Sequence, residues 1–232
     1  MYRKFISFAI VLAIVTCANT KIISSRLSQS QHQLSVDACI HAPSAAPSAA
    51  PSAPVVDVKT IKLMPRRVLI VGDSEACAVG FIAKNTVQKI NDEANQPRDI
   101  VSTVCKSSTV TSYWGEQGHL REAILRYPNP DVIIVFLGTN HYWQVSKSPD
   151  VSKILKEISD AHAHCVWVGN VAVKGKTWPI NKLLHDAVSH QCIYFDTEAA
   201  DIPLADGIHP NNAGSIKWLR LIWPVVPLKY EE

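Results

Sequence analysis

The sequence predicts an α/β fold, a three-layer α/β/α sandwich built around a five-stranded parallel sheet. From residue 66 onward, short segments of strand composition alternate with amphipathic segments of helical period. The strand segments are continuous apolar runs and do not alternate apolar with polar residues. Such runs are typical of a parallel sheet that is buried on both faces.

Five strands are expected, each a short run of apolar or β-branched residues. The first and third runs end in Gly72 and Gly138, where the chain turns away from the sheet. The fourth and fifth runs directly follow Cys165 and Cys192. The expected strands are 68–71, 99–104, 132–137, 166–168 and 193–195.

Five helices are expected between and after these strands. The clearest lies at 151–161, where apolar residues stand at positions i, i+3, i+4 and i+7 and define one buried face. The helix at 119–127 ends before Pro128, because proline disfavours helical backbone in the residue before it. The expected helices are 81–90, 119–127, 151–161, 181–188 and 212–222.

Residues 1–18 have the pattern of a signal peptide or membrane anchor. Arg3 and Lys4 precede an apolar run at 5–15, and small residues follow it. The segment also resembles a lipoprotein signal, although Thr before Cys17 is unusual there. Export is common to all three interpretations. We therefore expect an exported protein that is secreted, periplasmic or tethered to the outer side of a membrane.

Residues 19–65 are expected to form a disordered linker rich in Ala, Pro and Ser, followed by one domain at 66–232. The Ala-Pro-Ser repeat at 41–54 lacks the large apolar residues of a core and favours extended backbone, which suits a spacer. Residues 1–65 carry a net charge of +4, and residues 66–232 a net charge of −1. Because the folded part has no excess of positive charge, nucleic acid is not expected as a partner.

Three polar segments follow expected strands. Gly-Asp-Ser-Glu at 72–75 follows the first strand, and Gly-Thr-Asn-His at 138–141 follows the third. Asp-Gly-Ile-His at 206–209 follows the fifth strand after a short loop. In a doubly wound sheet the carboxyl ends of the strands share one edge, so we expect the three segments to meet there.

These segments supply the groups of a serine hydrolase. Ser74 needs a base within hydrogen-bond reach, and His209 fits that role. Asp206 is expected to orient the imidazole and stabilise its cation. The Asn140 side-chain amide and the Ser74 backbone N–H are expected to donate to a tetrahedral oxyanion, and the N-terminus of the following helix favours negative charge there. This chemistry requires no cofactor and no metal.

Over roughly residues 66–225, the segments resemble the sequence blocks of the SGNH hydrolase superfamily, also called GDSL-like esterases and lipases. They match the family's Gly-Asp-Ser-Leu, Gly-x-Asn-Asp and Asp-x-x-His blocks in the correct order. The resemblance implies a flavodoxin-like SGNH hydrolase fold. It also implies Ser74 as nucleophile, Asn140 as an oxyanion donor, and His209 with Asp206 as base and orienting acid.

The chain departs from the family's pattern at three positions. The glycine of the family's second block, whose N–H completes the oxyanion hole, falls by position within 105–109, and we place it at Ser107. A serine keeps this donor unless the position needs a positive φ, which favours glycine. Glu75 replaces Leu and His141 replaces Asp. The preferred interpretation is that Glu75 complements the positive helix N-terminus; the alternative is that either residue shapes a polar substrate pocket.

Aromatic residues near the expected site favour a substrate wall there. Trp114 follows the second strand, and Tyr142 and Trp143 follow the third, next to His141. We expect these four residues to bind substrate. Three further tryptophans lie in expected helices or strands and are assigned to the core, namely Trp167, Trp218 and Trp223.

The function that these observations favour is an exported serine esterase acting on a small ester or an acylated glycan, for example by removing O-acetyl groups. Lipid hydrolysis, thioester hydrolysis and acyl transfer on the same fold stay open, since the fold does not choose among them. A non-catalytic glycan-binding or assembly module is the alternative outside enzymes. The sequence predicts no oligomeric state.

Cysteine and histidine residues are assigned structural or surface roles. Cys165 and Cys192 begin neighbouring strands and are expected to pair in an oxidising compartment. Cys77 and Cys105 are a weaker candidate pair, with small buried hydrophobic residues as the alternative. Four histidines match no zinc motif in their spacing and are expected on the surface, namely His162, His164, His185 and His190.

Overall fold

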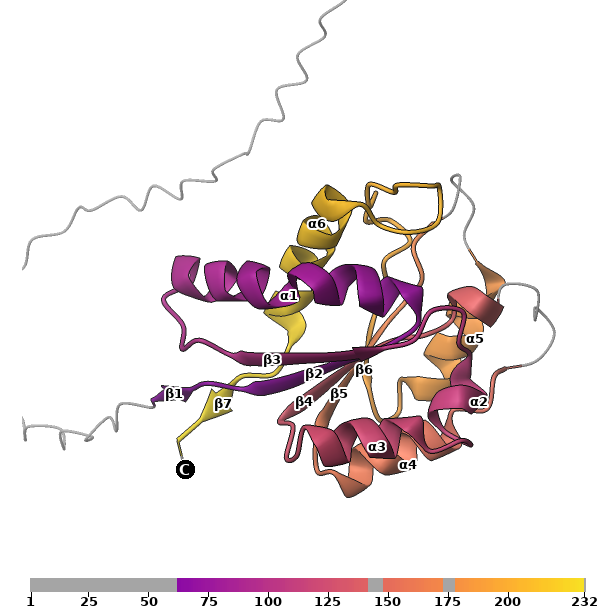
Figure 1. Ribbon diagram of the computed structural model, residues 1–232, viewed down its shortest axis with the longest axis horizontal. Coiled ribbons are helices and arrows are strands. Elements are labelled where there is room, and N and C mark those ends of the chain that lie inside the picture. The colour runs from indigo at the N-terminus through magenta and orange to yellow at the C-terminus, as the bar shows by residue number, and fades with distance from the viewer. Residues whose placement is uncertain (1–61, 142–147, 173–177, 232) are drawn as a thin grey trace, which may run out of the picture. The chain divides into compact units, whose positions relative to one another are not determined.

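The computed structural model describes residues 62–141, 148–172 and 178–231. Its main sheet has five parallel strands in the order β3-β2-β4-β5-β6 (Figure 1). This confirms the expected α/β fold with a parallel sheet. The strands are β2 (Arg67–Gly72), β3 (Ile100–Cys105), β4 (Val132–Phe136), β5 (His164–Val168) and β6 (Ile193–Phe195).

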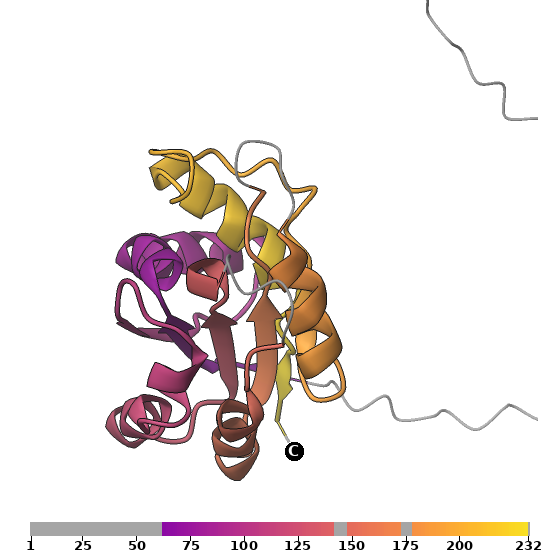
Figure 2. The same ribbon diagram turned by 90° about the vertical axis from the view of Figure 1, so that its right-hand side faces the viewer.

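Helices cover both faces of the sheet and complete the three layers. Helices α1 and α6 pack on one face, and α3, α4 and α5 pack on the other (Figures 1 and 2). The helices are α1 (Ser74–Glu93), α2 (Thr111–Trp114), α3 (His119–Arg126), α4 (Ser152–Asp160), α5 (Pro179–Val188) and α6 (Asn212–Ile222). Two short 3₁₀ helices are η1 (Thr139–His141) and η2 (Trp223–Val225).

Successive residues of a central strand enter different cores, which explains the continuous apolar runs. In β2, Val68 and Ile70 pack against the layer of α1 and α6, whereas Leu69 and Val71 pack against the opposite layer. All four side chains are buried. A strand that is covered on both faces has no position at which a polar side chain reaches water.

The folded domain begins before the expected boundary at residue 66. Strand β1 (Leu63–Met64) pairs antiparallel with β7 (Lys229–Tyr230), so both ends of the domain meet in a small second sheet. Buried Arg66 follows β1; its guanidinium bonds to Asp99 and to the Val226 carbonyl oxygen. The two strands are too short to show a periodic pattern in the sequence.

Helix α1 is longer than the expected helix at 81–90, because it begins at Ser74, directly after β2. Gly80, inside the helix, lies so close to β3 that an added Cβ would stand 2.3 Å from Thr103 Cγ2. The glycine that weakens the helical pattern in the sequence is therefore a contact point between helix and sheet.

Two disulfides join parts of this domain, and both expected pairs form. Cys77 of α1 is bonded to Cys105 at the end of β3, and Cys165 of β5 is bonded to Cys192 before β6. The second bridge links neighbouring strands near their first residues, as their order in the sequence predicted.

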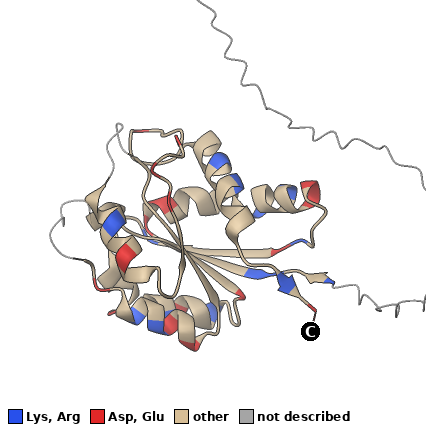
Figure 3. Cartoon of the chain, turned by 180° about the vertical axis from the view of Figure 1, so that it is seen from behind, with Lys and Arg blue, Asp and Glu red and all other residues tan. Residues whose placement is uncertain are grey.

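In Figure 3, basic and acidic residues are spread over several helices. On α4, Lys156 pairs with Asp160, and on α5, Lys182 pairs with Asp186. Among the described residues, no helix is long and apolar enough to cross a membrane. The predicted signal or anchor at 1–18 and most of the linker at 19–65 lie outside the described residues.

Candidate active site

Ser74 stands at a sharp turn from β2 into α1. Gly72 has a φ of 150°, and a Cβ there would lie 2.0 Å from the Phe136 carbonyl oxygen, so the turn requires glycine. Asp73 is the N-cap residue of α1 and accepts a hydrogen bond from the Glu75 N–H at 3.0 Å. The turn places Ser74 at the carboxyl end of the sheet and at the positive end of the helix dipole.

The loop before α6 brings a histidine and an acid to Ser74. His209 Nε2 lies 2.9 Å from Ser74 Oγ, and His209 Nδ1 lies 2.7 Å from Asp206 Oδ2. An ionised carboxylate can only accept, so the imidazole carries its proton on Nδ1 and turns the Nε2 lone pair toward the serine hydroxyl. The three side chains form one hydrogen-bonded chain, and a base in this position can remove the serine proton.

Asp206 is held ionised by the same loop. The backbone N–H of His209 donates to Asp206 Oδ1 at 2.8 Å, and the N–H of Ile208 donates to it at 2.9 Å. The pKa of Asp206 is held well below its usual range, first by the His209 backbone N–H and then by the imidazole and the Ile208 N–H. Gly207 has a φ of 84°, which lets the loop turn tightly between the acid and the histidine.

Asn140 lies beside Asp73 and joins three loops of the site. It belongs to η1, directly after β4. Its Nδ2 donates to Asp73 Oδ2 at 3.2 Å and to the Thr109 carbonyl oxygen at 3.0 Å. These two bonds occupy both amide hydrogens. Asn140 is therefore at the expected place, but its donors point at protein acceptors, and an oxyanion would have to share one of them.

Two buried carboxyl groups flank Ser74 in the sequence. Burial raises the pKa of Asp73 to about 7. Burial also raises the pKa of Glu75 well above its usual value, and the neighbouring Asp73 charge raises it further. Glu75 is 1% exposed, and its Oε1 has no hydrogen-bond partner among the described residues. This burial does not fit the expectation that Glu75 complements the positive helix N-terminus, because a buried carboxylate costs free energy unless it is fully paired.

The loop after β3 carries Ser107, where the second oxyanion donor was expected. Ser107 is not among the described residues with positive φ; the left-handed residue is its neighbour Ser108, with a φ of 60°. A serine at position 107 therefore adopts ordinary backbone and keeps its N–H. The N–H of the preceding residue, Lys106, already has an acceptor, because it donates to the Gly72 carbonyl oxygen at 3.0 Å.

The expected substrate wall is not formed by Trp114 in this structure. Its ring is 1% exposed and belongs to the core on the α3, α4 and α5 face. Its Nε1 donates to Thr109 Oγ1 at 3.0 Å, so it supports the loop after β3 instead of facing solvent. Tyr142 and Trp143, the other aromatic residues of the expected wall, lie outside the described residues.

His141 is also buried, at 5% exposure. Its Nε2 accepts the Thr111 backbone N–H at 3.1 Å, which ties η1 to the start of α2. A buried histidine bonded to backbone is a structural residue, so the expectation that His141 binds substrate finds no support in its position.

The remaining histidines and tryptophans lie where the sequence analysis placed them. The four histidines that match no zinc motif are exposed, as expected, namely His162, His164, His185 and His190. The three core tryptophans, Trp167, Trp218 and Trp223, are buried. Within 62–141, 148–172 and 178–231, no cluster of three or more His, Cys, Asp or Glu side chains could hold a metal ion.

A buried polar network behind the site was not predicted. Thr139 Oγ1 donates to Asn170 Oδ1 at 3.1 Å, and the Asn170 Nδ2 donates to Asn181 Oδ1 at 2.9 Å. Thr139 follows β4, Asn170 follows β5, and Asn181 lies in the first turn of α5. The only signal in the sequence is that Asn170 follows an apolar strand, which is too common to single it out.

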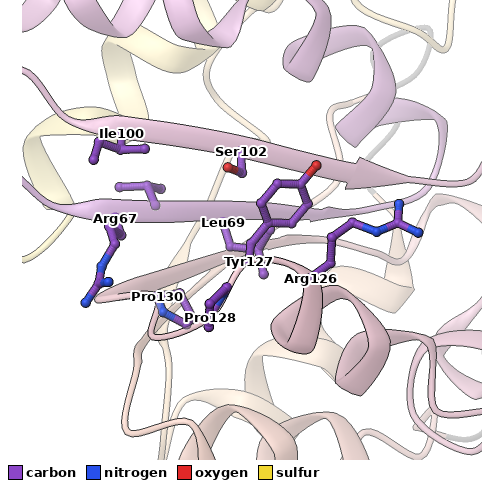
Figure 4. Close-up of a pocket in the computed structure, with 9 residues that line it drawn as sticks. Arg67, Leu69, Ile100, Ser102, Arg126, Tyr127, Pro128 and Pro130 are labelled. Atoms are coloured by element: carbon purple, nitrogen blue, oxygen red, sulfur yellow. The ribbon is translucent and has the colours of Figure 1, made fainter.

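An apolar hollow of about 280 Å³ lies on the sheet away from this site (Figure 4). It is lined by the beginnings of β2 and β3 and the segment after α3, with Arg67 and Arg126 at opposite ends and Tyr127 between them. Arg67 begins β2 and Ser74 follows its end, so roughly 20 Å of strand separates the two places. The hollow is not part of the candidate active site.

No protein-family model matches the chain, and no curated protein matches it. Solved structures do resemble it. TesA aligns with a TM-score of 0.54 and 18% identity over 68% of this chain and 97% of its own. The acetyl xylan esterase AlAXEase aligns with a TM-score of 0.55 and 13% identity over 69% of this chain and 100% of its own. A lipase/acylhydrolase from Enterococcus faecalis aligns with a TM-score of 0.52 and 16% identity over 72% of this chain and 99% of its own.

These neighbours are SGNH or GDSL-like hydrolases, and their structures align over nearly their whole length with the domain described here. At 13–18% identity the likeness establishes the fold and leaves the activity to the residues of the site. The order of the sheet, the layers of helices and the position of Ser74 after β2 agree with the expectation from the sequence. The chain therefore has the fold of the SGNH hydrolases.

Proposed function

We propose that this protein is an exported serine ester hydrolase in which Ser74, His209 and Asp206 form the catalytic triad. The observation that carries the proposal is the hydrogen-bonded chain from Ser74 Oγ through His209 to Asp206 at the carboxyl end of the sheet. Two separate segments supply these groups, the turn from β2 into α1 and the loop before α6, and each group has the bond that its role requires.

In the proposed reaction, Ser74 Oγ bonds to the ester carbonyl carbon while His209 Nε2 takes the hydroxyl proton. Asp206 stabilises the imidazolium that forms. The tetrahedral intermediate then breaks its bond to the alcohol oxygen, which receives the proton from His209. Water attacks the acyl-serine, His209 takes a proton from that water, and the acid leaves as Ser74 Oγ recovers its proton.

The oxyanion of each intermediate needs donors aimed at one point. The Ser74 N–H is among the first N–H groups of α1, which have no acceptor within a helix. The Ser107 N–H has no acceptor among the described residues. We assign these two backbone groups as the principal donors. Asn140 is a third donor only if its bond to Asp73 or to Thr109 lengthens during the reaction.

The substrate class that we propose is an O-acylated glycan, with acetyl as the acyl group. One structural neighbour is named an acetyl xylan esterase, and its name describes that protein's substrate. For this chain, the support is the export pattern at 1–18 together with two disulfides in the domain, which are typical of proteins outside the cytosol.

The test combines labelling by a fluorophosphonate with hydrolysis of a short-chain aryl ester. The serine oxygen displaces fluoride from the probe, so only an activated serine is labelled. We expect labelling and turnover in the wild type and the loss of both in Ser74→Ala. Ser159→Ala is the matched control, because Ser159 is an exposed serine of α4 on another part of the domain. Release of acetate from acetylated polysaccharides then tests the substrate class.

Two results would contradict the proposal. An unlabelled wild type that is inactive toward every ester would favour the non-catalytic alternative. Hydrolysis that persists in Ser74→Ala would place the nucleophile elsewhere.

A further inference from the structure

We propose that the Cys77–Cys105 disulfide is a positioning element of the candidate active site. In this inference the bridge holds the loop that presents the Ser107 N–H against the first turn of the helix that carries Ser74. The inference rests on the proposed function and adds to it a residue pair that sets the geometry of the oxyanion site.

The bridge joins the first turn of α1 to the end of β3. Cys77 stands three residues after Ser74, one turn along the same side of α1. Cys105 is the last residue of β3, beside Gly72 of β2, and Ser107 follows two residues later. The bridge therefore joins the nucleophile's helix to the strand end from which the second proposed donor extends.

The middle of the loop after β3 has few other restraints. Ser107 and Ser108 are exposed and take part in no hydrogen bond among the described residues. Ser108 adopts a φ of 60°, a backbone conformation that costs free energy for a residue with a Cβ. A strained conformation persists only where its surroundings hold it.

The restraints that exist lie at the two ends of the loop. At the far end, Thr109 Oγ1 donates to the Lys106 carbonyl oxygen at 2.7 Å, and Asn140 holds the Thr109 carbonyl oxygen. At the near end stand the Lys106 N–H bond to Gly72 and the covalent bridge at Cys105. Removal of the bridge leaves only non-covalent restraints at this end, namely the pairing of β3 with β2 and the Lys106 N–H bond to Gly72.

The second disulfide offers an internal control. Cys165 and Cys192 are 27 residues apart in the sequence, and Cys77 and Cys105 are 28 apart. Bridges that close loops of nearly equal length restrict the unfolded chain to nearly the same extent, so both removals are expected to lower stability by similar amounts. The control bridge lies near the beginning of β5, at the opposite end of the strands from Ser74.

The experiment compares Cys77→Ala/Cys105→Ala with Cys165→Ala/Cys192→Ala in the full chain. Removing both cysteines of a pair leaves neither former partner as a thiol that could pair wrongly. Kinetics on the aryl ester are measured well below the melting temperature of the less stable variant. We expect kcat of Cys77→Ala/Cys105→Ala to fall by about 10-fold to 100-fold with KM within about 2-fold, since loss of a whole oxyanion donor costs about 10²-fold to 10³-fold. The control keeps kcat within about 2-fold.

A double-mutant cycle tests whether the bridge acts through Ser107. Ser107→Pro removes the N–H, and Ser107→Ala keeps it. In the bridged protein, we expect Ser107→Pro to lower kcat by about 10²-fold relative to Ser107→Ala. Without the bridge, the same change should cost less than about 10-fold, because coupled residues are not additive.

Amide hydrogen exchange supplies a readout apart from activity. Exchange of the Lys106 amide, which is bonded to the Gly72 carbonyl oxygen, should quicken in Cys77→Ala/Cys105→Ala and stay unchanged in the control variant, since the bridge is local to that loop.

The measurements distinguish failure of the proposed function from failure of this inference. If the wild type is inactive, the proposed function fails and the inference fails with it. If the wild type is active and both bridge variants keep equal kcat, the inference is overturned while the proposed function stands. If Cys77→Ala/Cys105→Ala does not fold, Ser107→Pro decides: a kcat equal to that of Ser107→Ala overturns the inference.

Discussion

At the scale of single residues, the segment from Asp73 to Glu75 combines a nucleophile with two buried acids. The Asp73 carboxylate accepts two hydrogen bonds. The Glu75 N–H donates one, which caps α1, and the Asn140 side-chain amide donates the other. Glu75 has no such partner for its Oε1 among the described residues. Burial raises the pKa of both groups, and the Asp73 charge raises the pKa of Glu75 further.

The stability of the protein should therefore depend on pH through Glu75. Its pKa in the folded state lies above the unfolded value, so the folded state binds more protons and loses stability as the pH rises above the unfolded pKa. We expect Glu75→Gln to be more stable than the wild type at pH 8 and to show a smaller loss between pH 5 and pH 8. Urea denaturation midpoints of the two proteins, measured between pH 5 and pH 8, check this prediction. Parallel pH profiles of the two proteins would contradict the burial of an ionisable Glu75.

Asp206 should matter for catalysis more than for folding. Asp206→Asn keeps the size of the side chain but no longer favours the imidazolium, so kcat should fall by about 10²-fold to 10⁴-fold. Asp201→Asn, at an exposed aspartate before the same loop, is the control and should keep its kcat. Steady-state kinetics on the aryl ester measure both. Equal activity of the two variants would remove Asp206 from the triad.

At the scale of elements, the sequence predicts those parts whose signal is a run of apolar residues. Strands β2 and β4 and helices α4 and α6 lie within one or two residues of their expected bounds. The first turns of α1 and all of α2 were missed, because capping and tertiary contacts decide them. The pattern of α1 is weakened by Gly80, whose role depends on the approach of β3.

The close approach of α1 to β3 makes a signed prediction. On an exposed helix, Gly→Ala stabilises by up to about 1 kcal/mol. At Gly80 the new Cβ would overlap Thr103, so we expect Gly80→Ala to destabilise by about 1–3 kcal/mol. Thr103→Ser should recover part of that loss in the double variant. Urea denaturation measures the four proteins, and a stabilised Gly80→Ala would show that α1 does not lie this close to the sheet.

At the scale of the whole molecule, the parallel sheet explains why the site was partly predictable. Strand ends gather at one edge, so Ser74 after β2 and His209 in the loop beyond β6 were expected to meet, and they do. The path of the chain between β3 and β4 has no comparable rule. Trp114 therefore turned out to be a core residue, and the bonds of Asn140 to Asp73 and Thr109 could not be read from the sequence.

The disulfide between β5 and the segment before β6 should serve stability alone. It closes a loop of 27 residues, so its removal in Cys165→Ala/Cys192→Ala is expected to cost about 3–4 kcal/mol in the free energy of unfolding. Both cysteines are buried, and the alanines leave a small cavity that adds to the loss. Chemical denaturation of the oxidised wild type and the variant checks the value, and unchanged stability would argue against the bridge.

Ser74 is proposed as a nucleophile activated by His209 and Asp206. The most direct test is fluorophosphonate labelling followed by identification of the labelled peptide. We expect a single modification on Ser74 in the wild type, none in Ser74→Ala, and a labelling rate that is strongly reduced in His209→Ala. Labelling of another residue, or equal labelling of wild type and Ser74→Ala, would contradict it.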